Sequence, residues 1–198
     1  MGGMKDCGGL NPLERARRLE EEADFVLHEA GVHDALRTYG RVVPTGSYFL
    51  DLMVYPDIDL YISQVSLEQL FAIGAQLARS PLVFQVIFEK DFDQTMAGGF
   101  YLKPRIRYGD WGRPWKIDIW ALDDAAIDER MAPMRRFQEK MTPPLREAIL
   151  QYKVSILTSS QRTPMHSGYF IYRAFLDEGI SDPGEVTRFL VEHGIQMQ

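Results

Sequence analysis

One short segment, Asp57-Ile58-Asp59-Leu60, strongly constrains how this chain can fold. In a β-strand, successive side chains point to opposite faces, so both carboxylates would lie on one face and both apolar side chains on the other. Two carboxylates held side by side repel each other unless a cation lies between them. Mg²⁺ prefers oxygen ligands and commonly takes one or two carboxylates together with phosphate oxygens of a substrate. The segment therefore predicts a strand with one buried face and one metal-binding face.

Two further segments could complete such a site. Asp118 lies among apolar residues in a second strand-like segment, 116–120, and could supply a third carboxylate to a pair of metal ions. Gly46 and Ser47 precede the acidic pair and predict a turn whose backbone N–H groups can face a phosphate. Each acid has an ordinary alternative, because Asp57 follows a proline, as in many turns, and Asp118 could be the polar half of an edge strand. Taken together, the three acids favour the metal site.

The order of these pieces resembles the motif of the nucleotidyltransferase superfamily, which has the polymerase-beta-like fold. Gly-Ser, a spacer of nine residues, Asp-apolar-Asp and a distal apolar-Asp-apolar occur between Val42 and Leu122. The pattern is most similar to small, non-templated members such as the antibiotic and minimal nucleotidyltransferases. The resemblance implies an α+β fold with a mixed β-sheet core, flanking helices and a C-terminal helical lobe. It implies that the catalytic, metal-binding residues are Asp57, Asp59 and Asp118, and that nucleotide binding involves Gly46 and Ser47.

The resemblance also implies an activity. The expected reaction is the Mg²⁺-dependent transfer of a nucleoside monophosphate, commonly AMP in this superfamily, from an NTP to a hydroxyl of a small-molecule acceptor. Two Mg²⁺ ions are expected, and Asp118 is either a metal ligand only or the base that takes the hydroxyl proton. The alternatives are a protein- or RNA-modifying nucleotidyltransferase of toxin–antitoxin type and a non-catalytic nucleotide-binding protein with the same fold. The retention of three acids in a metal-binding pattern argues against the non-catalytic alternative.

Basic side chains alternate with apolar ones in the predicted strand 100–108. If a hairpin pairs Tyr108 with Trp115, Arg105 lies opposite Asp118, on the metal face. A one-residue change of register would place the basic face on the far side of the sheet, and the sequence does not decide between the two registers. On the first register, the side chains expected to neutralise the triphosphate are Lys103, Arg105 and Lys116.

Lys153 is a further candidate for phosphate binding. It lies in the predicted helix 143–157, from which a lysine that faces a cleft could reach a phosphate group. A lysine on the exposed surface of a helix is the commoner arrangement, and we favour that interpretation. This interpretation makes a simple structural prediction, because the ammonium group should then be in contact with solvent.

Periodicity and turn residues predict the other elements. Strands are expected at 41–45, 57–63, 82–88, 100–108 and 115–121, and helices at 12–28, 34–39, 66–79, 124–140, 143–157, 167–178 and 183–193. After residue 123 the sequence predicts helices alone. We therefore expect a disordered tail at 1–11, a nucleotidyltransferase core at 12–122 and a helical lobe at 123–198.

Composition limits the partners. Among 198 residues, 28 acidic side chains outnumber 22 basic ones, and this net charge of −6 argues against a long nucleic acid as partner. The expected partners are a nucleoside triphosphate and a small-molecule hydroxyl acceptor. Cys7 is the sole cysteine, so neither an internal disulfide nor a cysteine-based zinc site can form. The sequence shows no apolar run that could span a membrane, and a cytoplasmic location is expected. It does not indicate the oligomeric state.

Overall fold

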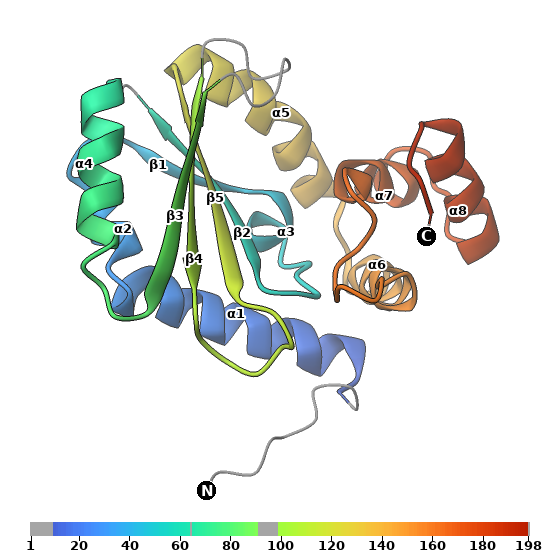
Figure 1. The fold of residues 1–198 in the computed structure, drawn as a ribbon. Coiled ribbons are helices and arrows are strands. Elements are labelled where there is room, and N and C mark those ends of the chain that lie inside the picture. Colours follow the sequence, from blue (N-terminus) through green and yellow to red (C-terminus); the bar gives the residue numbers. More distant parts are fainter. Residues whose placement is uncertain (1–9, 64, 91–98, 198) are drawn as a thin grey trace, which may run out of the picture.

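The computed structural model describes residues 10–63, 65–90 and 99–197. Five strands in these residues form one sheet in the order β1-β2-β5-β4-β3 (Figure 1). They are β1 (Val42–Thr45), β2 (Asp57–Ser63), β3 (Val83–Lys90), β4 (Phe100–Ile106) and β5 (Trp115–Leu122). The central pair, β2 and β5, is parallel, and the other neighbouring strands are antiparallel. The predicted α+β class with a mixed sheet is confirmed.

Helices flank the sheet and follow it. They are α1 (Pro12–Glu29), α2 (Val32–Arg37), α3 (Gly46–Phe49), α4 (Leu67–Leu77), α5 (Asp124–Lys140), α6 (Pro143–Ser155), α7 (Ser167–Leu176) and α8 (Pro183–Glu192). In the described part of the chain only helices follow β5, which confirms the predicted helical lobe. None of the helices described combines the length and apolar character needed to cross a bilayer.

The predicted N-terminal tail lies almost entirely outside the described residues, which begin at Leu10. The start of α1 is fixed by a capping box. The Asn11 side chain accepts a hydrogen bond from Glu14 N at 2.9 Å, and Glu14 Oε2 accepts one from Asn11 N at 3.4 Å. Asn11 is therefore part of the folded chain, and the helix begins where Pro12 predicts it.

Two apolar cores pack against the central strands. The first joins one face of the sheet to α1, α2 and α4, and its fully buried residues include Ile58, Ile117 and Ile119. The second joins α5–α8 to the segment after α3, where Leu52 has no exposed surface. Figure 1 shows α2 and α4 at one side of the sheet and α6–α8 at the opposite side of the molecule. The carboxylate face of β2 and β5 is thereby left beside the helical lobe.

The register of the β4–β5 hairpin differs from the predicted one. Arg105 lies opposite Lys116, so the expected pairing of Tyr108 with Trp115, and of Arg105 with Asp118, is wrong. The offset is two residues, which preserves the face on which each side chain lies. The basic face of β4 therefore remains on the same side of the sheet as the carboxylates.

A buried tryptophan explains this shorter ladder. Residues 107–114 form a connection in which Trp111 is only 3% exposed, and its Nε1 donates a hydrogen bond to Glu22 Oε2 at 2.6 Å. Arg107 N bonds to Leu82 O, beside β3, rather than continuing the pairing with β5. The loop closes over α1, and the strands must separate after Ile106 to let it do so. Local turn residues do not encode this contact.

Candidate metal centre

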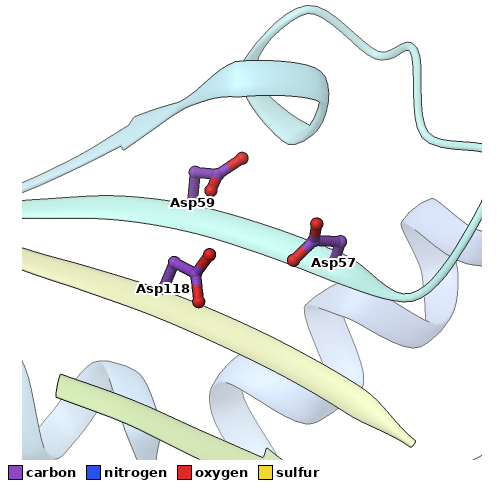
Figure 2. A group of neighbouring side chains, drawn as sticks. All are labelled: Asp57, Asp59 and Asp118. Carbon is purple, nitrogen blue, oxygen red and sulfur yellow. The ribbon is translucent and has the colours of Figure 1, made fainter. Parts of the chain in front are cut away.

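Three carboxylates meet on the front face of the two central strands (Figure 2). Asp57 and Asp59 project from β2, and Asp118 projects from β5, where it pairs directly with Asp59 in the parallel ladder. Each residue offers one oxygen atom, and these three atoms lie within 4.8 Å of one another. The structure therefore brings together the three acids singled out in the sequence, since strand alternation and parallel register together leave them no other arrangement.

Burial makes this arrangement electrostatically costly. Desolvation, and to a smaller extent the Asp118 carboxylate, outweigh the lowering effect of Lys116 and raise the pKa of Asp57 to about 6. The pKa of Asp59 is also well above its ordinary value, first because of burial and then because of the other two carboxylates. A bound cation would relieve both the desolvation and the repulsion.

The ammonium group of Lys116 lies between two of these acids. Its Nζ is 2.7 Å from Asp118 Oδ2 and 3.1 Å from Asp57 Oδ1. Burial lowers the pKa of Lys116, but Asp57 and Asp118 outweigh burial and hold it above its ordinary value. The Lys116 ammonium group therefore partly neutralises two of the three carboxylates.

The donor atoms fit Mg²⁺. All three side chains offer oxygen, the element that this ion prefers, and they converge from two rigid strands. Asp57 Oδ1 is buried and makes no hydrogen bond within the described part of the chain, although the Lys116 ammonium is near it. A buried carboxylate oxygen in this state is costly, and a metal ion would satisfy it. Asp57, Asp59 and Asp118 are the residues that would hold the ion.

Gly46 and Ser47 form the first turn of α3 rather than an open turn. Gly46 has a φ of 62°, and a Cβ atom at this position would clash with Asp59 Oδ2, so only glycine fits. Burial raises the pKa of the Tyr172 hydroxyl of the helical lobe, and the nearby Ser47 side chain acts in the opposite direction. The predicted phosphate-binding pair is therefore adjacent to the carboxylates and to α7.

Lys153 is buried, and the predicted exposed position is wrong. It is 2% exposed, and its Nζ donates hydrogen bonds to Leu52 O at 2.5 Å and to the Tyr172 hydroxyl at 3.0 Å. Burial lowers its pKa to about 7, and the carboxylates of Asp57 and Asp59 act in the opposite direction. The error arose because α6 is covered by the segment after α3 and by α7, which the periodicity of α6 alone does not show.

The basic side chains of β4 lie on the carboxylate face, with different neighbours. Lys103 Nζ lies 5.1 Å from the centre of the Tyr101 ring and 4.0 Å from Glu89 Oε1, on the neighbouring strand. The Arg105 guanidinium lies against the Phe84 ring, at 5.5 Å. The structure thus brings both residues to the face of the site without a direct contact to the three acids in the described chain.

Tyr101 is a neighbour of the acids that the sequence analysis missed. Its hydroxyl donates a hydrogen bond to Asp118 Oδ1. Burial, and next the Asp118 carboxylate, raise the pKa of Tyr101. The residue could have been found from strand alternation, because Tyr101 shares a face with Lys103 and Arg105. Its partner could not, since that depends on the register of the hairpin.

Comparisons with known proteins give structural neighbours. No family model matches the sequence, and a search of curated proteins finds no similar protein. The solved structures similar to this chain include the Cid1 poly(U) polymerase with bound MgGTP, at 18% identity and a TM-score of 0.48 over 70% of this chain and 43% of that one. They also include the non canonical poly(A) polymerase complex GLD-2–GLD-3, at 15% identity and a TM-score of 0.48 over 85% of this chain and 59% of that one.

These two neighbours are named a poly(U) polymerase and a poly(A) polymerase complex, and those names describe the neighbours themselves. The chain spans less than two thirds of either neighbour. The poly(U) and poly(A) polymerase activities named for those proteins belong to them. The function of this chain must therefore be inferred from its own side chains.

Proposed function

We propose that this chain is a Mg²⁺-dependent nucleotidyltransferase that transfers a nucleoside monophosphate, AMP, from a nucleoside triphosphate to a hydroxyl group of a small-molecule acceptor. The proposal is carried by one observation: three carboxylates from two adjacent strands each offer an oxygen atom within 4.8 Å of the others. Carboxylates in such a group suit Mg²⁺, which completes its shell with waters and substrate phosphate oxygens. AMP is the group that members of the resembled superfamily commonly transfer.

In this reaction, the acceptor oxygen forms a bond to the α-phosphorus while the bond to the bridging oxygen breaks and pyrophosphate leaves. One ion on Asp57 and Asp59 and a second shared with Asp118 would supply charge neutralisation and lower the pKa of the acceptor hydroxyl. The Asp118 carboxylate is either a ligand alone or the base that accepts the hydroxyl proton. In both roles the hydrogen bond from Tyr101 would hold its orientation.

The phosphates of the nucleotide would be held where α3 meets the helical lobe. Gly46 and Ser47 are proposed to donate hydrogen bonds beside Asp59, against which the Gly46 backbone packs closely. Lys153, whose Nζ donates to the Tyr172 hydroxyl near Ser47, is proposed to contact the phosphates from the helical lobe. Its pKa of about 7 means that a nearby polyanion would favour its charged form.

The basic residues of the sheet are proposed to take part in the same way. The Lys116 ammonium would leave the carboxylates when a metal ion binds, because the two cations compete for the same oxygen atoms. A lysine released in this way has a flexible stem and can turn toward the triphosphate. Lys103 and Arg105 share its face of the sheet, and we propose that they contact the nucleotide as well.

A pyrophosphate-release screen tests the proposal. The protein is incubated with Mg²⁺ and each of the four NTPs, first with pools of hydroxyl-bearing small molecules and separately with an RNA oligonucleotide. We expect release with ATP and a small-molecule pool, and none when EDTA is present. Release with the oligonucleotide alone would replace the small-molecule acceptor by an RNA acceptor.

An ATP titration, combined with this screen, distinguishes the enzyme from the non-catalytic nucleotide-binding alternative. ATP affinity is measured by isothermal titration with and without Mg²⁺. Metal-independent ATP binding without pyrophosphate release in any pool would favour a non-catalytic nucleotide-binding protein. We expect instead that ATP binding requires Mg²⁺, since the three carboxylates would otherwise repel the triphosphate.

A further inference from the structure

Three arginines from distant parts of the sequence approach one another near Asp57. Arg105 lies on β4, Arg113 on the loop between β4 and β5, and Arg162 on the connection between α6 and α7. Each side chain is partly buried. Arg113 lies beside the loop that carries Arg162, because its Nη1 donates to the carbonyls of Ser160 and Gln161. Burial, helped by the charges of Arg162 and Arg105, lowers the pKa of Arg113. One end of the site is therefore lined by cations from both lobes.

The Arg113 side chain is held in place by uncharged groups, which leave its positive charge without a counter-ion in the portion of the chain that the structure describes. Its guanidinium lies over the Tyr55 ring, 5.1 Å from the ring centre. Its Nη1 donates to Gln161 O at 3.3 Å and to Ser160 O at 3.5 Å, which are long hydrogen bonds to neutral carbonyls. Burial lowers the pKa of Arg113, and Asp57 opposes this effect from beyond ion-pair distance. Most of its donor groups remain available to a ligand.

Several other arginines in the molecule form ion pairs. Arg41, Arg136 and Arg146 each have a carboxylate within 2.8 Å. Among the described residues, neither Arg113 nor Arg162 forms an ion pair. The chain has 28 acidic side chains and 22 basic ones, so acids were available to pair them. Like charges brought together without a counter-ion oppose folding, and such an arrangement is typical of a site for an anion.

The loop that carries Arg162 is held in shape before any ligand binds. The backbone carbonyl of Arg162 accepts hydrogen bonds from Thr158 N at 2.9 Å and from Thr158 Oγ1 at 3.0 Å. Gln161 has a φ of 54°, which is unusual for a residue other than glycine. Thr163, which follows Arg162, is buried, and its hydroxyl lies 3.3 Å from that of Tyr55. A preformed loop lowers the entropy cost of binding.

We propose that Arg113 and Arg162 together bind a phosphate group, at a subsite other than the turn at Gly46 and Ser47. A guanidinium group offers planar, paired N–H donors that match phosphate oxygens. The two subsites lie at different carboxylates, because Gly46 packs on Asp59, whereas Arg113 acts on Asp57. The bound group is either the far end of the triphosphate or a phosphate carried by the acceptor. The inference rests on the proposed function, since both sources are substrates of that reaction.

Inorganic phosphate is the probe for the first experiment. Its binding to the full chain is followed by the arginine Nε–H signals in ¹⁵N NMR, without metal. We expect Arg113→Gln and Arg162→Gln each to weaken phosphate binding at least tenfold. Arg79→Gln, which removes an exposed charge at the end of α4, is the matched control and should bind phosphate as the wild type does. Equal phosphate affinity in all four proteins would overturn the inference.

A second arm identifies the source of the phosphate. The titration is repeated with Mg²⁺ and saturating α,β-methylene-ATP. Competition between the analogue and inorganic phosphate would assign the subsite to the triphosphate, and simultaneous binding would assign it to the acceptor. Arg113→Lys retains the charge without the paired donors and should recover only part of the affinity. Thermal melts confirm that each variant is folded, and Arg162→Gln, in the exposed connection, serves if Arg113→Gln unfolds.

Phosphate binding is measured without turnover, so the two proposals can fail separately. If the wild type releases pyrophosphate but the arginine variants bind phosphate normally, this inference fails alone. If phosphate binding depends on both arginines but no acceptor yields pyrophosphate, the proposed transfer fails and the anion site stands.

Discussion

The two faces of the central strands β2 and β5 differ in chemistry although they share one backbone: the back face is apolar and the front face carries the carboxylates. On the back face, Ile58, Ile117 and Ile119 are fully buried and pack against α1, α2 and α4. On the front face, Asp57 and Asp59 are equally regular in spacing, yet burial and the neighbouring carboxylates raise the pKa of both and so work against their charged forms. The apolar face stabilises the fold, and the acidic face is tolerated because the other holds the strands in register. We therefore expect side chains of the back face to determine stability and side chains of the front face to determine function.

The largest effect should follow a change on the front face. Asp118→Asn keeps the shape of the side chain but removes its negative charge and replaces one of its two oxygen atoms by an amide nitrogen, which cannot bind a metal ion. We expect the transfer rate to fall at least 1000-fold, about 4 kcal/mol of transition-state stabilisation, with little change in the affinity for Mg·ATP. Single-turnover kinetics and ATP titration measure the two quantities. Glu129→Gln, an exposed change on α5, is the control, and retained activity in Asp118→Asn would refute the assignment of the triad.

The next change breaks the back face. Ile117→Ala removes a fully buried side chain one residue from Asp118, and truncations of this kind cost about 2–5 kcal/mol. We expect the free energy of unfolding in urea to fall by this amount while the folded variant keeps its transfer rate. Val191→Ala, at a position that is 56% exposed, should change stability little. If Ile117→Ala lowered the transfer rate as much as Asp118→Asn does, the two faces would not be separable.

The pH dependence of stability should also report the front face. Desolvation raises the pKa of Asp57 to about 6 in the folded chain. The folded state therefore binds more protons than the unfolded state between about pH 4 and pH 6, so stability is lost as the pH rises through this range. One pKa unit corresponds to about 1.4 kcal/mol, and the loss from Asp57 is thus on the order of 3 kcal/mol. Thermal melts in EDTA measure it, and Asp57→Asn should flatten the profile; an unchanged profile would contradict the shift.

Lys116 joins the two acids, and its removal sharpens the comparison. Lys116→Met keeps most of the stem but leaves Asp57 and Asp118 without their cation. We expect a loss of about 2 kcal/mol of stability without metal, below the 3–5 kcal/mol typical of a fully buried pair, because the ammonium is partly exposed. Mg²⁺ should then raise the melting temperature more than it does in the wild type, since its competitor is gone. An equal rise in both proteins would show that Lys116 and the metal do not compete.

Strand alternation and turn residues were enough to predict the five strands and the described helices other than α3, and together with the family resemblance they predicted the convergence of Asp57, Asp59 and Asp118. These features depend on local periodicity and on one parallel register, which the apolar back face enforces. The register of the β4–β5 hairpin was mispredicted because it is set by Trp111, whose contact with Glu22 lies far away in sequence. No periodic signal contains such a contact.

The helical lobe was harder to interpret for the same reason. Lys153 was expected on the surface, yet it is covered by α7 and by the backbone of Leu52. The approach of Arg113 to the loop before α7 likewise depends on how the lobe packs against the sheet. A sequence pattern can place a residue on a face of its own element. It cannot say which element will cover that face.

The smallest expected effect concerns Ser47, at the edge of the front face. Its side chain lies near the Tyr172 hydroxyl, and in the proposed complex it would donate a hydrogen bond to a phosphate oxygen. Ser47→Ala should weaken ATP binding about tenfold, because a hydrogen bond to a charged group contributes about 1.5–3 kcal/mol and the backbone N–H groups remain. The affinity for AMP should be unchanged, since AMP lacks the distal phosphates. Isothermal titration with both nucleotides measures this difference, with Ser80→Ala, after α4, as the control. Equal ATP affinity in Ser47→Ala and the wild type would mean that the Ser47 side chain does not contact the phosphates, and the close packing of Gly46 on Asp59 would then be the remaining reason for the glycine.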